Sequence, residues 1–187
     1  MADLVAYARA NPGKLNFGTS GAGTASHTMG VGPQALADIR FAHIPYKGSA
    51  DVIQAMLAGT IDVAGALPSL VVPQINAGKL RALAVTAGAR SEFLPDVPTY
   101  RETGIDYADG EHYGIVGPKG LPEPIVQRLA AAIADAVKLP DFQALMKKTY
   151  TSIQYLAPAD YQKLLDERER EWRRYLGNAK FIEVMNL

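Results

Sequence analysis

Hydrophobic and polar positions follow two different periods along the first 112 residues. Short runs rich in β-branched and aromatic residues are typical of buried strands, and they occur at 14–20, 41–45, 60–66 and 80–88. Apolar residues at helical spacing predict helices at 2–10, 25–37 and 49–59, and 67–78 is predicted to be a short helix or a turn. Strands that alternate with helices over short connections predict a parallel sheet with helices on its faces, so the expected fold class is α/β.

The pattern changes near residue 112, where helices begin to dominate. These later helices are predicted at 122–139, 141–150 and 158–179. Only two short runs, 113–117 and 151–157, are typical of strands there. We therefore expect an α/β domain at 1–112 and a mostly helical tail at 113–187. Because a helix is stabilised mainly by burying its apolar face, the tail helices either pack on the first domain or cover strands that another segment or chain supplies.

Bulk composition narrows the function classes. The chain has 187 residues, its nineteen basic residues balance nineteen acidic ones, and it contains no cysteine. The neutral balance gives no support to a nucleic-acid partner or an anionic membrane surface, and the lack of cysteine excludes disulfides, zinc-thiolate sites and a cysteine nucleophile. No apolar run approaches the ~20 residues of a membrane span, and residues 1–14 lack the basic and apolar regions of a signal peptide.

The segment GTSGAGTASH, residues 18–27, places glycines and hydroxyl residues between a predicted strand and a predicted helix. A dinucleotide-binding loop would need a third glycine where this chain has Ser26. A hydrolase is disfavoured because Ser26 and His27, as neighbours on a helix, point about 100° apart, and no G-x-S-x-G elbow is present. We expect His27 to form a local hydrogen bond in the first helical turn.

Binding of an anion is the interpretation that we favour for this loop. A strand that ends in small residues and opens a helix presents unpaired N–H groups at the positive end of the helix dipole, where a carboxylate is stabilised. The same arrangement recurs at 45–51, with Ser49 as the predicted N-cap, and at 65–69. Loops at the carboxyl ends of neighbouring parallel strands lie along one rim, which is where open α/β sheets bind ligands.

The roles of two side chains in these loops stay open. Lys47, the one cation within them, either pairs with a ligand carboxylate or is solvated, and Tyr46 either walls the site or packs in the core. The histidines at 27, 43 and 112 lack the spacing of metal ligands, so we predict no metal and no cofactor.

Several ungapped blocks of the chain resemble one family of proteins. They are NPGKLNFGTSGAGTASH, HIPYKGSADVIQAMLAGTIDV, LPSLVVPQINAGKLRALAVT, LPDVPTYRETG and YGIVGPKGLPEPIVQRL. In this order they look like the extracytoplasmic solute-binding receptors of tripartite tricarboxylate transporters, the Bug or TctC family. The resemblance runs from about residue 3 to about residue 175, which is nearly the whole chain.

The resemblance implies a fold like that of periplasmic binding proteins, in which two α/β lobes enclose a small organic acid held by loop amides, hydroxyls and ordered water. Residues 1–112 would form lobe two, with its mostly parallel sheet flanked by helices. Residues 113–187 would be the C-terminal portion of lobe one, whose N-terminal part is not in this chain. The predicted ligand-binding residues are Ser20, Gly21, Thr24, Ser26, His27, Tyr46, Lys47, Gly48, Ser49, Ala66, Pro68 and Ser69.

One departure from the family concerns ligand chemistry. Many members have an aspartate or aromatic residue just before the third loop, where this chain has Gly65 and Ala66. A ligand amine would find no acidic partner at that place.

The expected function is that of a receptor, not an enzyme, which binds a small organic carboxylate and works with membrane transporter subunits. The alternative is a remnant that binds no ligand and self-associates, as a homo-oligomer in which the tails cover each other or exchange between chains. A hydrolase is the third and least favoured hypothesis. The resemblance implies a periplasmic location, whereas the lack of a signal peptide would make the protein cytoplasmic if this is the full gene product.

Overall fold

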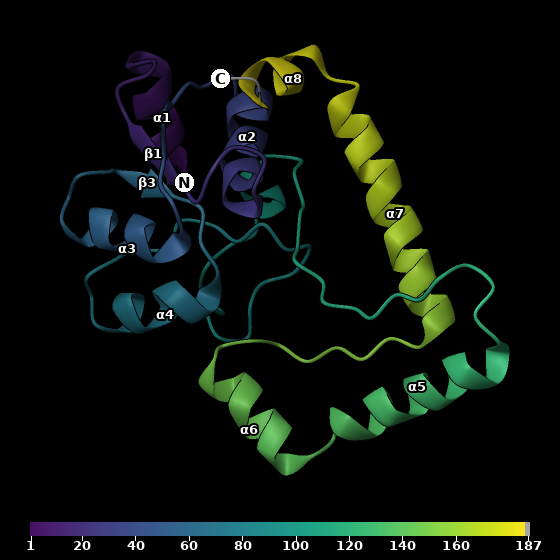
Figure 1. Ribbon diagram of the computed structural model, residues 1–187. Helices are drawn as coiled ribbons and strands as arrows, with labels where there is room; N and C mark the ends of the chain where they lie inside the picture. The colour runs from purple at the N-terminus through teal and green to yellow at the C-terminus, as the bar shows by residue number, and fades with distance from the viewer. Residues whose placement is uncertain (186–187) are drawn as a thin grey trace. The chain divides into compact units, whose positions relative to one another are not determined.

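The computed structural model describes residues 1–185, which form two compact units (Figure 1). The first unit comprises Met1–Glu111 and the described residues from Leu176 onward, and the second unit comprises His112–Tyr175. The sequence pattern assigned all of 113–187 to one tail, of which 186–187 lie outside the described residues. The structure instead groups helix α8 (Ala179–Met185) with the first unit, because α8 packs against α2 (Ala25–Ala37).

A small parallel sheet flanked by helices forms the first unit. Its strands are β1 (Asn16–Thr19), β2 (Ala42–Pro45) and β3 (Val63–Ala64), in the order β2-β1-β3. Its helices, in addition to α2 and α8, are α1 (Ala2–Ala10), α3 (Ser49–Leu57), α4 (Pro68–Asn76) and the single-turn η1 (Arg101–Thr103). Both neighbours run parallel to β1, with Phe17 opposite His43 on one side and Val63 on the other. The predicted α/β class is confirmed.

Glycines in α2 make room for aromatic rings of the core. A Cβ at Gly30 would overlap the ring of Phe17, and one at Gly32 would lie 2.6 Å from the ring of Tyr107. Phe17 in turn stacks on Phe41, with ring centroids 5.6 Å apart. These glycines lower the helix propensity of α2, but the buried rings that they admit stabilise the helix by packing.

Three predicted strands are absent from the described residues. The run 80–88 forms only an isolated bridge between Val85 and Thr99, and the runs 113–117 and 151–157 form no strand. A strand needs a neighbouring backbone to satisfy its N–H and C=O groups. The amide of Val85 is bonded instead to the carbonyl of Pro98, at 2.9 Å. In the second unit, Ile115 and Val116 are 72% and 78% exposed, as expected of apolar residues with no adjoining strand.

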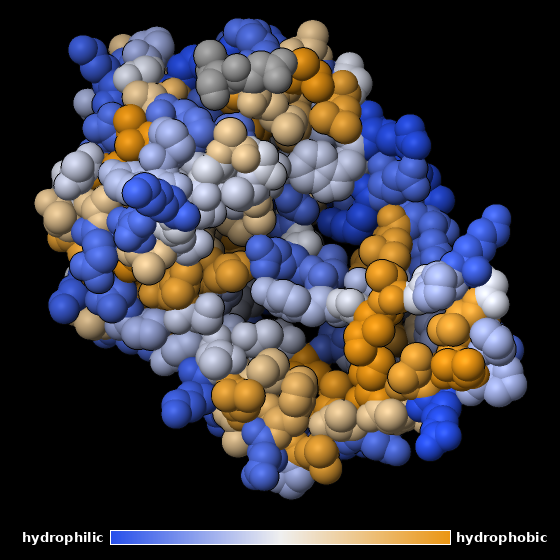
Figure 2. Space-filling model, viewed as in Figure 1, coloured by the Kyte–Doolittle hydropathy of each residue, from blue (hydrophilic) through white to orange (hydrophobic). Residues whose placement is uncertain are grey.

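The second unit consists of helices α5 (Glu123–Ala136) and α6 (Pro140–Lys148), most of α7 (Pro158–Leu176), and connecting segments. Proline lies in the first turn of α5 and α6, where its missing N–H costs nothing. Neither of these two helices contains a buried residue. Figure 2 shows hydrophobic side chains gathered on the surface of this region. Leu129 on α5 and Leu145 on α6 are both exposed. Within residues 1–185, none of the helices has both the length and the apolar character needed to span a bilayer.

Candidate ligand site

The candidate site lies where the three parallel strands end. Each of β1, β2 and β3 is followed by a loop that leads into a helix, namely α2, α3 and α4. Because the strands are parallel and adjacent, these three loops meet at one edge of the sheet. The sequence prediction located this edge correctly because strand ends and helix starts are encoded locally.

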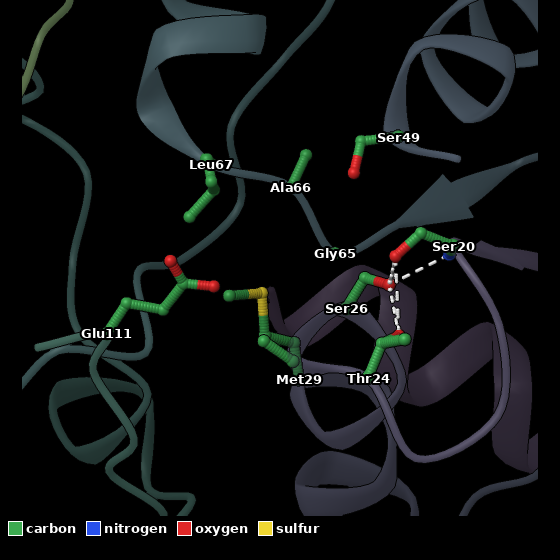
Figure 3. Close-up of a pocket in the computed structure, with 10 residues that line it drawn as sticks. Ser20, Thr24, Ser26, Met29, Ser49, Gly65, Ala66, Leu67 and Glu111 are labelled. Atoms are coloured by element: carbon green, nitrogen blue, oxygen red, sulfur yellow. Dashed lines mark hydrogen bonds between the residues drawn. The ribbon is translucent and has the colours of Figure 1, made fainter. Parts of the chain in front are cut away.

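A network of hydroxyl groups shapes the glycine loop, which we define as residues 20–24. The Ser26 hydroxyl accepts from the Ser20 amide at 2.9 Å and is also bonded to the Ser20 and Thr24 hydroxyls, at 2.9 and 3.0 Å (Figure 3). The Thr24 hydroxyl donates to the Gly21 carbonyl at 2.7 Å. Thr24 is the N-cap of α2 but makes no side-chain bond to the amides of the first turn. The positive end of α2 therefore faces the site without a side-chain cap.

Helix α3 presents a similar terminus. Its N-cap is Gly48, which is extended (φ −172°, ψ 168°) and has no side chain to cap the helix. Ser49 is thus the first helical residue and not the N-cap that the sequence predicted. Because Ser49 lies inside the helix, its hydroxyl does not cap α3 and is directed toward the site, as Figure 3 shows.

A cavity of about 160 Å³ lies among these loops. It is lined by Ser20, Thr24, Ala25, Ser26, Met29, Ser49, Gly65, Ala66, Leu67 and Glu111, all from the first unit. Four of these carry hydroxyl groups, and the one ionisable side chain among them is Glu111. Its carboxylate lies on the opposite side of the cavity from Ser20 in Figure 3.

The absence of a side chain at Gly65 brings the third loop close to α2. A Cβ at this position would lie 2.8 Å from both the Ser26 carbonyl oxygen and the Met29 Cβ. Any larger residue would push the loop and the helix apart. This close approach is a physical reason for glycine at position 65. The family resemblance implies that many members have an aspartate or aromatic residue near this position.

The backbone carbonyl of Met29, a residue that lines the cavity, is bonded to a tyrosine side chain because a proline follows four residues later. Pro33 has no N–H to give to the Met29 carbonyl four residues earlier in α2. The hydroxyl of Tyr100 donates to this carbonyl instead, at 3.2 Å. Burial raises the pKa of Tyr100 to about 12, so this donor keeps its proton throughout the physiological range.

Five predicted site residues line the cavity, namely Ser20, Thr24, Ser26, Ser49 and Ala66. The other predicted residues are not among its lining, namely Gly21, His27, Tyr46, Lys47, Gly48, Pro68 and Ser69. The side chains of Lys47 and Ser69 are exposed. Contact between any of these residues and a ligand stays a prediction.

The sequence analysis missed several lining residues, notably Met29 and Glu111. Met29 lies three residues after Ser26 on α2, and this spacing places both side chains on one helix face, so helical periodicity was a usable signal. No local signal marked Glu111, because it reaches the cavity from a segment far along the chain.

His27 lies behind the glycine loop and not in the cavity wall. Its Nδ1 accepts from the Gly23 amide at 3.1 Å, so the predicted local hydrogen bond is present. Its ring, 3% exposed, stacks on that of His43 with centroids 4.5 Å apart. Burial, and then the charge of His43, lower the pKa of His27 below 6.5. The hydroxyl of Ser26 is engaged by Ser20 and Thr24, so these residues do not assemble a nucleophile and base.

Residues 1–185 contain no group of three or more histidine and acidic side chains placed to hold a metal ion. The chemistry that the cavity offers is therefore that of hydroxyls, helix amides and one carboxylate.

Comparison with known proteins identifies the family. A model of the tripartite tricarboxylate transporter family receptor matches residues 1–180. The chain belongs to this family. Members of the receptor family are solute-binding proteins and not enzymes. A Cupriavidus necator relative, the UPF0065 protein in the gbd 5' region, is 34% identical over 183 residues, or 96% of this chain and 56% of that protein.

Solved structures of the receptor family have the same fold. The periplasmic binding protein BugD aligns with a TM-score of 0.76 at 29% identity, over 92% of this chain and 58% of that chain. MatC from Rhodopseudomonas palustris with bound malate aligns with a TM-score of 0.74 at 25% identity, over 99% of this chain and 61% of that chain. The chain thus spans a little over half the length of the first relatives that it matches.

Proposed function

We propose that this protein is the solute-binding component of a tripartite tricarboxylate transport system and that it binds a small organic carboxylate in the cavity described above. The observation that carries the proposal is the convergence of two helix starts without side-chain caps and four hydroxyl-bearing residues on one cavity. Such a site stabilises a carboxylate through N–H and O–H donors without a cationic side chain. The family membership supports the same class of ligand.

Glu111 adds a restriction on the proposed ligand. Because it lies across the cavity from Ser20, a carboxylate bound at the helix starts directs its far end toward the Glu111 side chain. The group at that end of the ligand must therefore fit beside Glu111. Malate, which is bound to the similar MatC, carries both a hydroxyl and a second carboxylate and is a suitable first probe.

The two units have proposed counterparts in the receptor fold. We assign the first unit to lobe two and the second unit to the C-terminal portion of lobe one, as the sequence resemblance implied. A periplasmic location and contact with the membrane subunits of the transporter are part of the same proposal.

The test is calorimetric titration with malate, citrate and simple hydroxy and amino acids. Ser49→Ala removes a hydroxyl from the cavity wall, and Ser152→Ala makes the same change at an exposed residue outside the cavity lining and outside the predicted site. We expect Ser49→Ala to weaken binding roughly tenfold or more, because a hydrogen bond to a charged group contributes about 1.5–3 kcal/mol. Ser152→Ala should leave the affinity unchanged. Equal affinities for both variants would remove the site assignment, and no binding of any acid would remove the proposed function.

A second candidate function is self-association without ligand binding. The exposed apolar residues of the second unit favour it, among them Tyr113, Ile125 and Leu129, which are 77%, 47% and 46% exposed. Contiguous apolar surface of this kind marks interaction sites. Light scattering would then detect a homo-oligomer, including one with exchanged segments. A compact monomer at micromolar concentration would contradict self-association.

A further inference from the structure

We propose that His27 is a positioning residue for the ligand cavity, and that its protonation releases the glycine loop and lowers ligand affinity as the pH falls below neutral. The inference rests on the proposed function for the cavity. It assigns to His27 a role that needs no contact with the ligand, since this side chain lies behind the loop and outside the cavity lining.

The bond between His27 and Gly23 fixes the protonation state of the imidazole. Gly23 donates its amide proton to Nδ1 of His27 at 3.1 Å, so Nδ1 must carry a lone pair. A proton added to Nδ1 turns this acceptor into a donor that faces another donor. The hydrogen bond is then lost, and the end of the loop that enters α2 loses its anchor.

A second anchor of the same loop depends on the neighbouring histidine. The hydroxyl of Thr19 lies 2.6 Å from Nε2 of His43 and accepts from the Gly21 amide at 3.3 Å. The amides of Gly21 and Gly23 are thus held by the stacked pair of imidazoles, one through Thr19 and the other directly. Both glycines have positive φ, 123° and 75°, so the loop has a specific backbone shape that these bonds maintain.

The surroundings of His27 make its protonated form unfavourable. Burial is the main cause, and the charge of His43 on β2 adds to the effect. Helix α2 carries no other ionisable residue and β1 carries none. The charged groups on the packed helix α8, Lys180 and Glu183, are paired with Asp38 and Arg40 near the far end of α2. The segment after η1 also packs on α2, and its Asp109 carboxylate accepts from the Thr28 and Tyr107 hydroxyls at 3.3 and 3.2 Å. Burial and His43 are the two causes that act on the pKa of His27.

The loop connects this titration to the cavity. Ser20, which lines the cavity, is bonded to Ser26 through both its amide and its hydroxyl, and Thr24 is bonded to the Gly21 carbonyl. Release of Gly23 frees the chain between these two hydroxyl residues. The donors that we propose for a ligand carboxylate then lose their arrangement, and affinity falls.

The first experiment needs no ligand. The amide resonances of Gly23 and the ring nitrogens of His27 are followed by NMR from about pH 7.5 to about pH 5. We expect the Gly23 amide to shift together with the His27 ring, with a midpoint below 6.5, and the Gly59 amide at the end of α3 to stay unchanged. A Gly23 amide that does not follow the His27 ring overturns the inference, whether or not any ligand binds.

The second experiment measures malate affinity over the same pH range in three proteins. Wild type and the control variant His112→Gln should lose roughly tenfold in affinity on acidification, which corresponds to one lost anchoring hydrogen bond. His27→Gln, whose side-chain carbonyl accepts at every pH, should show a flatter profile. Because the same malate titrates in all three proteins, its own protonation cancels. Parallel profiles in wild type and His27→Gln contradict the inference, whereas the absence of malate binding at any pH counts against the ligand choice alone and leaves the NMR result decisive.

Discussion

Both units contain helices that the sequence predicted, but the helices of the two units differ in how much they bury. In the first unit, α2 buries ten of its thirteen residues, including Val31 and Ala35. In the second unit, α5 has fourteen residues and buries none. Both helices could be read from the sequence, since periodicity depends only on the order of residues along the chain. Burial depends on a partner surface, and for α2 that surface is the sheet and the aromatic rings around it.

This difference separates two kinds of stabilisation. The first unit joins its helices to a hydrogen-bonded sheet through a dry aromatic core, and its loops are held in turn by that frame. The described residues of the second unit form no sheet, so its helices depend more on local propensity and on whatever covers their apolar faces. The candidate cavity lies wholly within the better-packed unit, as a site that relies on positioned amides requires.

Truncating one large apolar side chain in each unit should show the largest difference in stability between the two units. Phe17→Ala removes a ring that is 4% exposed and stacked on Phe41, and we expect a loss of about 3–5 kcal/mol. Leu129→Ala, at a residue 46% exposed on α5, should change stability by only about 0.5 kcal/mol. Native-state hydrogen exchange resolves each unit separately and is the appropriate measurement.

The stability change in Leu129→Ala tests whether another chain covers the apolar faces of the second unit in solution. A loss comparable to that of Phe17→Ala would show that Leu129 is buried against another chain. In that case the difference between the units would disappear, and the loss should diminish on dilution.

Added methyl groups test the same comparison in the opposite direction. Gly32→Ala places a Cβ 2.6 Å from the fully buried ring of Tyr107, and overpacking should cost about 1–3 kcal/mol, offset in part by the better helix propensity of alanine. Gly114→Ala meets Tyr161, but the atoms nearest to it are the hydroxyl end of a half-buried ring that can turn aside. We expect a change within about 0.5 kcal/mol there. Chemical denaturation with exchange-detected populations measures both, and a larger loss for Gly114→Ala would contradict the assignment of loose packing to the second unit.

These glycines also show how far the sequence could be interpreted. It predicted α2 correctly at 25–37, because helical spacing is a local signal. It could not show that Phe17 and Tyr107 occupy the space, because Tyr107 comes from a distant loop. The site divides in the same way. The hydroxyls at strand ends were predictable from turn chemistry, whereas Glu111 enters the cavity through tertiary structure alone. The run 80–88 had strand-like residues, but no neighbouring strand pairs with it along its length.

Acidification should weaken the first unit through His27. Its pKa is lowered in the folded state by burial and by His43, so the unfolded chain binds the proton more readily. The free energy of unfolding is therefore highest above pH 6.5 and falls as the pH decreases through the lowered pKa of His27. His27→Gln should remove this part of the pH dependence, as measured by denaturation at a series of pH values. An unchanged slope in that variant would assign the acid sensitivity to other groups.

The smallest expected difference concerns surface ion pairs. Glu183 on α8 pairs at 2.8 Å with Arg40, which is distant in sequence, whereas Glu169 pairs with Arg173 one turn along α7. Glu183→Gln should cost up to about 1 kcal/mol and Glu169→Gln up to about 0.5 kcal/mol, since Arg40 is the less exposed arginine and exposed helix pairs contribute little. Both losses should shrink at about 1 M salt because exposed charges are screened. No loss of stability in Glu183→Gln would mean that α8 is held to the first unit by its buried Phe181 and Val184 alone, with no contribution from the ion pair.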